Sequence, residues 1–236
     1  MSGERPVIGL ALGAGSARGW AHIGVIKALQ DLGMEPDLVA GTSVGAIVGA
    51  IHGLDALAGF EEWVLSLTRR DIVGYMDVSL SAGGFFQGKR LVRSFREYFG
   101  EPGFDDLRLP FGAVATELDT GIEVWLRDGP VADAVRASIA LPGIFTPAYH
   151  QGRWLVDGGL VNPVPVSLCR AMGAERVIAV NLNGDILGRH FQSGGRSGSR
   201  RADPNWVDRL TAGIRARVPQ VKVPQMPNLV PLPARS

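Results

Sequence analysis

A serine between two glycines is the residue of this chain whose setting best suits covalent chemistry. The segment Gly41-Thr42-Ser43-Val44-Gly45 follows an apolar strand-like run at residues 38–40 and leads into a helix of small residues over 44–51. This arrangement is typical of a nucleophile elbow, a sharp strand-to-helix turn that exposes the serine hydroxyl and accepts only very small neighbours. The start of the helix adds free amides and positive dipole, which favour negative charge developing near Ser43. The pattern predicts a nucleophile, although Gly-x-Ser-x-Gly also arises by chance in a chain with 32 glycines.

A serine nucleophile needs a partner that takes its proton and donors that receive an oxyanion, and a glycine-rich segment could supply the donors. Gly13-Ala14-Gly15-Ser16-Ala17-Arg18-Gly19 lies between the first expected strand and the first expected helix. Its small residues let backbone amides converge at a helix N-terminus, which suits an oxyanion or a phosphate. A dinucleotide-binding loop is the alternative, but Arg18 stands in place of the last glycine of that motif, and no acidic residue clearly ends the next strand.

The proton acceptor is predicted in Trp154-Leu155-Val156-Asp157-Gly158-Gly159, where an aspartate ends an apolar strand beside two glycines. Asp-Gly is also a common turn pair, and taken alone this segment favours a turn slightly over a catalytic role. The order of the three segments, a glycine loop, a serine elbow and a late Asp-Gly-Gly, changes that balance. Together with Ala21-His22-Ile23-Gly24-Val25 and Ser138-Ile139-Ala140-Leu141-Pro142-Gly143-Ile144-Phe145, they resemble the patatin-like phospholipase family. The resemblance extends over residues 1–185 and is strongest to small, single-domain bacterial members.

The resemblance implies a fold, a reaction and a set of site residues. The fold would be a three-layer α/β/α arrangement with a mostly parallel central sheet. The protein would be a serine acyl hydrolase of the lipase or phospholipase type, cleaving fatty-acyl esters through an acyl-enzyme without metal or cofactor. Ser43 would be the nucleophile and Asp157 its general base, a dyad without histidine. The expected oxyanion hole is formed by the amides of Gly15, Ser16, Ala17 and Arg18, and Gly158 and Gly159 complete the Asp-Gly-Gly motif.

Three features of the chain bear on this expectation. The family loop is typically Gly-Gly-Gly-x-Arg/Lys-Gly, so the side chains of Ala14 and Ser16 could narrow the oxyanion hole. An aspartate with an ordinary pKa near 3.9 accepts a serine proton reluctantly, and burial would help by raising that pKa. Arg18 could brace the loop, meet a substrate phosphate, or form a surface salt bridge.

Other functions stay open at this stage. A thioesterase or general carboxylesterase would use the same residues, and a low-activity regulatory or binding protein would fit the departures at Ala14 and Ser16. A histidine-dependent triad is the weaker alternative, because none of the four histidines occupies a strong catalytic context, and His22 reads as a packing or loop-bracing residue. No pair of His, Asp or Glu has convincing spacing for a metal. The histidines are His22, His52, His150 and His190.

The expected partner is a lipid or acyl-ester substrate, with transient contact to a membrane surface through residues 79–86 or a helix around Trp206. An apolar acyl channel is predicted from aromatic and leucine side chains near the catalytic segments, although ordinary core packing would also explain each of them. These candidates are Trp20, Phe85, Phe86, Leu141 and Phe145.

Composition limits the class of protein. A chain of 236 residues that is 46% hydrophobic and 20% charged can bury one sizeable core. A formal net charge of +1 argues against a nucleic-acid surface. No secretory signal is evident, and the apolar run over 38–51 is shorter than the roughly 20 residues of a membrane span. With a single cysteine, Cys169, the sequence favours a cytoplasmic protein, while its oligomeric state stays open.

Hydrophobic periodicity gives the elements that must position these residues. Strands are expected over 7–12, 37–41, 111–116, 122–126, 154–156 and 177–182, and helices over 20–32, 44–51, 61–70, 88–99, 131–138 and 164–172. Alternating apolar strands and helices indicate a mostly parallel sheet covered on both faces. Gly45, Gly49 and Gly53 share one helical face, which predicts close packing of that helix. We expect a catalytic domain over 1–185, and a flexible basic Gly/Ser/Arg loop, a short amphipathic helix and a Pro-rich tail over 186–236.

Overall fold

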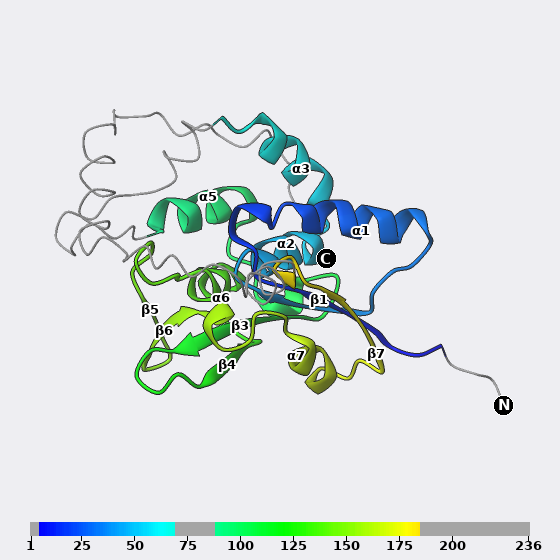
Figure 1. The fold of residues 1–236 in the computed structure, drawn as a ribbon. Coiled ribbons are helices and arrows are strands. Elements are labelled where there is room, and N and C mark those ends of the chain that lie inside the picture. The colour runs from blue at the N-terminus through cyan, green and yellow to red at the C-terminus, as the bar shows by residue number, and fades with distance from the viewer. Residues whose placement is uncertain (1–4, 69–87, 185–236) are drawn as a thin grey trace, which may run out of the picture.

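The chain folds around a mixed β-sheet (Figure 1). The computed structural model describes residues 5–68 and 88–184. Within them the strand order is β5-β6-β3-β2-β1-β7, with β4 paired to β3 off this path. The neighbours β7, β1, β2 and β3 are parallel, whereas β4 and β6 run antiparallel to β3, and β5 runs antiparallel to β6. The strands are β1 (Ile8–Leu12), β2 (Leu38–Thr42), β3 (Phe111–Glu117), β4 (Glu123–Leu126), β5 (Ala148–His150), β6 (Arg153–Asp157) and β7 (Arg176–Val180).

Helices cover both faces of this sheet. In Figure 1, α1, α2, α3 and α5 lie above the strands and α7 lies below them. Side chains alternate accordingly: Leu10 and Leu12 of β1 join the larger core cluster with α1 and α2, while Ala11 joins the smaller cluster with α7. The expected three-layer α/β/α fold with a mostly parallel sheet is confirmed. The helices are α1 (Ala21–Asp31), α2 (Val44–Gly53), α3 (Leu57–Ser66), α5 (Lys89–Phe99), α6 (Val131–Ser138) and α7 (Val166–Ala171), with short 3-10 turns η1 (Ser16–Arg18), η2 (Phe104–Asp106) and η3 (Gly158–Leu160).

The periodicity located these elements well, with two differences. Helix α3 begins at Leu57 and ends at Ser66, whereas the expected helix covered 61–70, so both of its ends were placed wrongly. Strand β5 was not expected at all. It is three residues long, too short for an alternating pattern to be recognised, and it is defined by pairing with β6. The predicted tail and its helix over 186–236 lie outside the described residues, as do residues 79–86.

The glycines of α2 allow this helix to sit directly on the strands, as expected. A Cβ atom at Gly45 would lie 2.1 Å from the carbonyl oxygen of Leu12 in β1, and one at Gly49 would lie 2.9 Å from the ring of Phe111 in β3. Any larger side chain would therefore push the helix away from the sheet. Helix α2, which begins directly after Ser43, therefore lies in close contact with β1.

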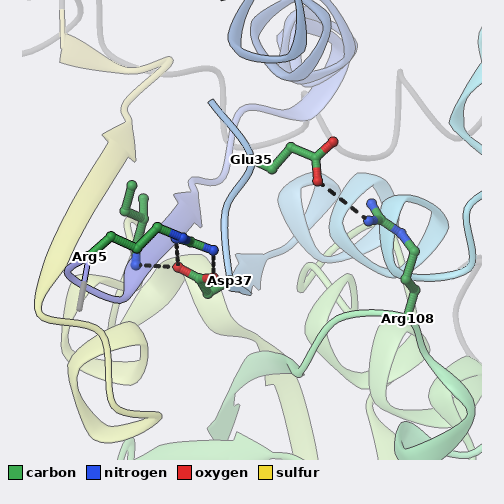
Figure 2. A network of polar contacts seen from close by, with 5 residues as sticks. Arg5, Glu35, Asp37 and Arg108 are labelled. Atoms are coloured by element: carbon green, nitrogen blue, oxygen red, sulfur yellow. Dashed lines mark hydrogen bonds and ion pairs between the residues drawn. The ribbon is translucent and has the colours of Figure 1, made fainter. Parts of the chain in front are cut away.

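The amino ends of β1 and β2 are joined by charged residues on the side of the sheet shown in Figure 2. The Arg5 guanidinium donates two hydrogen bonds to Asp37, at 2.8 and 2.6 Å, and the Ile8 amide donates a third at 2.8 Å. These donors hold the pKa of the Asp37 carboxyl below its ordinary value. Nearby, Arg108 Nη1 lies 4.0 Å from Glu35 Oε2. The predicted nucleophile and base lie instead at the carboxyl ends of strands: Ser43 directly follows β2, and Asp157 is the last residue of β6.

Among the helices in the described part of the chain, none combines the length and apolar character needed to cross a membrane.

Candidate active site

The ends of two strands meet beside β3 and bring the predicted nucleophile and base together. Thr42, the last residue of β2, pairs with Val114, and Asp157, the last residue of β6, pairs with Ala115. Strand β4 pairs with both Val114 and Ala115 on the other edge of β3. Because a strand has only two edges, β2 and β6 share one of them and approach each other from opposite directions. Ser43 and Asp157 therefore lie next to each other although 114 positions separate them.

The two side chains are in direct contact. Ser43 Oγ donates a hydrogen bond to Asp157 Oδ2 at 2.6 Å, and the Gly159 amide donates one to Asp157 Oδ1 at 2.7 Å. Asp157 is only 3% exposed. Burial raises its pKa above the ordinary aspartate value, and the hydrogen bonds from Ser43 and Gly159 offset part of that rise. A carboxylate with a raised pKa accepts a proton more readily, which is what a base beside a serine requires.

The backbone at Ser43 has the conformation expected of an elbow. Its φ of 57° and ψ of −124° are rare for a residue with a side chain. A Cβ atom at Gly41 would lie 2.5 Å from the Cα atom of Ala46, and one at Gly45 would meet β1, so both neighbours must be glycine. The Ser43 amide donates a hydrogen bond to Ser138 Oγ at 2.9 Å. The turn leaves the serine side chain partly exposed at the start of α2.

The glycine loop and the Asp-Gly-Gly segment lie against the elbow. A Cβ atom at Gly19 would lie 2.1 Å from Cγ1 of Val44, and Val44 directly follows the serine. A Cβ atom at Gly159 would lie 3.2 Å from the Cβ of Ala14. The structure therefore brings all three predicted segments into contact.

The four amides predicted for the oxyanion hole differ in their backbone hydrogen bonds. The amides of Gly15, Ser16 and Ala17 donate to no other backbone carbonyl within the described residues. The Arg18 amide instead donates to the Gly15 carbonyl at 3.0 Å, closing the 3-10 turn η1. The Arg18 amide is thus already hydrogen-bonded within the turn, and its role as an oxyanion donor stays a prediction.

Side chains from distant segments brace the glycine loop. Arg18 Nη2 donates to Asn183 Oδ1 at 2.9 Å, and Asn183 Nδ2 donates to the Ala14 carbonyl at 3.0 Å. The His22 ring contacts the Gly13 carbonyl through Nε2 at 2.7 Å, which requires a proton on that nitrogen. Burial lowers the pKa of His22, which favours the neutral form of the ring. The bracing roles considered for Arg18 and His22 are the ones observed. Asn183 was missed, because a polar residue after a strand carries no signal for this contact.

The remaining histidines give no support to a triad. His52 is buried within α2, where burial and Arg108 lower its pKa. His150 lies on β5, beside a hollow whose walls include neither Ser43 nor Asp157. His190 lies outside the described residues. Within residues 5–68 and 88–184, no three His, Cys, Asp or Glu side chains gather closely enough to hold a metal ion.

Of the five side chains predicted to line an acyl channel, three lie within the described residues. A hollow of about 1170 Å³ lies between α5, α6 and the strands β5 and β6, and its walls include Arg136, Tyr149 and Trp154 but neither Ser43 nor Asp157. Trp20 packs on Phe60 beside the main core. The centroid of the Phe145 ring lies 5.7 Å from Cζ of Arg136. Trp20, Leu141 and Phe145 do not line this hollow. Phe85 and Phe86 lie outside the described residues.

The chain is similar in sequence to several known proteins. Residues 10–170 match the family model described as "Patatin-like phospholipase". The uncharacterized NTE family protein Rv1063c of Mycobacterium tuberculosis is 40% identical over 215 residues, which cover 89% of this chain and 57% of that protein. Human patatin-like phospholipase domain-containing protein 6 is 36% identical over 182 residues, and Drosophila melanogaster neuropathy target esterase sws is 31% identical over the same length. Each of these last two matches covers 74% of this chain and 13% of the relative. The matches thus span less than two thirds of each relative.

Proposed function

The chain belongs to the patatin-like phospholipase family, and on that basis we propose that it is a serine acyl hydrolase that cleaves the fatty-acyl ester bonds of lipids. The single observation that supports this proposal best is the 2.6 Å hydrogen bond from Ser43 Oγ to the buried carboxylate of Asp157. The elbow geometry supports a nucleophilic serine, and the family description supports a lipid ester as the class of substrate.

The proposed reaction uses the dyad in two half-reactions. Ser43 Oγ attacks the ester carbonyl while its proton passes to Asp157 Oδ2, and the carbonyl oxygen becomes an oxyanion. Asp157 then gives the proton to the departing alcohol, which leaves an acyl group on Ser43. A water molecule, deprotonated by Asp157, attacks this acyl-enzyme and releases the fatty acid. Ser43 recovers its proton from Asp157 at the end of the cycle.

The oxyanion is proposed to bind the amides of Gly15, Ser16 and Ala17. These amides belong to a loop in contact with Val44 and braced by His22 and Asn183. A donor fixed before the reaction stabilises developing charge without a further cost of reorganisation. Arg18 contributes through its side chain, which holds Asn183 against the loop.

A fluorophosphonate probe tests the nucleophile directly. We expect labelling of the wild type at Ser43 and none of the Ser43→Ala variant. Ser94→Ala is the matched control, because Ser94 is a buried serine on α5 that the mechanism does not use. Absence of labelling in the folded wild type would favour a regulatory or binding protein that keeps the fold.

Acyl-ester turnover tests the base. Asp157→Asn should abolish hydrolysis of both short and long acyl esters, while Asp133→Asn, a surface carboxylate paired with Arg96, should leave it intact. Unchanged turnover in Asp157→Asn would rule out the dyad. The name of the Drosophila relative favours a carboxylesterase as the second candidate, and the ratio of short-chain to long-chain ester turnover separates the two. A thioesterase, the remaining alternative, would prefer acyl thioesters in the same assay.

A further inference from the structure

Helix α6 ends with a buried serine that no step of the proposed mechanism uses. Ser138 is the last residue of α6 and is 0% exposed. Its hydroxyl accepts a hydrogen bond from the Ser43 amide at 2.9 Å and donates one to the Val114 carbonyl at 2.6 Å. The side chain therefore links the backbone of the nucleophile to the strand beside which the nucleophile and the base meet.

The Ser43 amide has few other possible partners. As the residue before the first turn of α2, Ser43 cannot donate its amide within the helix. A buried amide without an acceptor is costly, and the positive φ of Ser43 adds backbone strain at the same residue. The Ser138 hydroxyl satisfies this amide while the elbow keeps its strained shape.

The end of α6 also contacts the base. The Asp157 amide donates a hydrogen bond to the carbonyl of Ala140, two residues beyond Ser138, at 3.0 Å. One short segment thus holds the backbone of both predicted catalytic residues, Ser43 through a side chain and Asp157 through a carbonyl. Val114, which receives the Ser138 hydrogen bond, pairs with Thr42 and precedes Ala115, the partner of Asp157.

We propose that Ser138 is a positioning residue, whose hydroxyl fixes the backbone of Ser43 and so aligns the serine hydroxyl with the carboxylate of Asp157. Its effect on rate rests on the proposed hydrolase function, but its effect on the backbone does not. Because Ser138 contacts neither the serine hydroxyl nor the carboxylate by a hydrogen bond, it acts through the orientation of the nucleophile.

The Ser138→Ala variant tests the proposal. We expect the rate of fluorophosphonate labelling at Ser43 and kcat for a soluble acyl ester to fall about 10- to 100-fold, the effect expected of a small misplacement of a reacting group. KM for the same ester should stay unchanged, because the hydroxyl is not placed against substrate. Exchange of the Ser43 amide hydrogen, measured by NMR, should become faster than in the wild type.

Ser94→Ala is the matched control, since it also removes a buried hydroxyl, and it should keep wild-type labelling and wild-type exchange at Ser43. If Ser138→Ala does not fold, Ser138→Cys makes the same comparison, because a thiol has the same connectivity as the hydroxyl, is somewhat larger, and hydrogen-bonds more weakly. Wild-type labelling in a folded Ser138 variant, an effect on KM alone, or unchanged amide exchange would overturn the proposal. If the wild type is not labelled, the hydrolase proposal fails, and the exchange measurement still decides whether Ser138 holds the elbow.

Discussion

The carboxyl group of Asp157 carries the most informative electrostatic feature of this molecule. Three observations define it: near-complete burial, a hydrogen bond from the Ser43 hydroxyl, and a hydrogen bond from the Gly159 amide. Burial is the largest influence on its pKa and raises it. The same burial that strengthens the base also makes its charged form costly, and the two consequences can be measured separately.

The first consequence concerns activity. A general base works only when deprotonated, so turnover should decline as the pH falls through the raised pKa of Asp157. The acid limb of kcat/KM for a soluble acyl ester should therefore lie above the range in which an ordinary aspartate, with a pKa near 3.9, titrates. The measurement is a pH profile of the wild type, checked against thermal unfolding at each pH. An acid limb at or below the ordinary aspartate range would contradict the assignment.

The second consequence concerns stability. Since the folded pKa of Asp157 is raised, the folded state binds a proton more tightly than the unfolded state, and stability decreases as the pH rises through the window between the ordinary and the raised pKa. Asp157→Asn removes the buried charge and should stabilise the protein at neutral pH, by about 0.5 to 2 kcal/mol. The gain should shrink at pH 4. Urea unfolding of both proteins at the two pH values measures it, and a large loss of stability at pH 7 would show that the carboxylate is a net stabiliser.

Among the helices and strands, the contact of α2 with β1 sets the position of the elbow. The helix can lie this close only because Gly45 has no side chain where the Leu12 carbonyl lies. Close packing of this helix was predicted from Gly45, Gly49 and Gly53, because their spacing along one helical face can be read from the local sequence. The partner of each glycine was not predicted, since it depends on strand order.

Substitution of Gly45 tests this contact. Gly45→Ala should destabilise the protein by about 2 to 3 kcal/mol, because a Cβ atom 2.1 Å from the Leu12 carbonyl forces α2 away from β1. The serine would move with the helix, so labelling should also slow. Gly24→Ala in α1 is the matched control: no atom lies within 4 Å of its Cβ position, and a helical Gly-to-Ala change should stabilise by about 0.5 to 1 kcal/mol. Equal effects of the two substitutions in urea unfolding would refute this interpretation.

Considered as a whole, residues 5–68 and 88–184 contain both core clusters, and the last strand, β7, completes the parallel half of the sheet against β1. The contacts of the glycine loop extend slightly further, to Asn183. We therefore propose that the catalytic domain covers residues 1–185. The contact of Asn183 with the glycine loop means that the domain extends at least to residue 183.

Truncation tests that proposal. A protein ending at residue 185 should unfold cooperatively and label at Ser43 at the wild-type rate, because it retains the cores and Asn183. A protein ending at residue 180 is the matched control. It keeps β7 but loses the hydrogen bonds from Asn183 to the Ala14 carbonyl and from Arg18 to Asn183, so its labelling should slow. Failure of the longer protein to fold would place part of the domain beyond residue 185.

The sequence by itself determined the elbow at Ser43, most of the alternating strands and helices, and the three-layer class, because turn stereochemistry and hydrophobic periodicity act between near neighbours in the chain. Only the tertiary structure decided that β6 runs antiparallel to β3 and meets the end of β2, and that Ser138 and Asn183 hold the elbow and the glycine loop. Such contacts join residues far apart in the chain. Their partners are selected by strand order and register, which the packing of the whole core sets and no local pattern records.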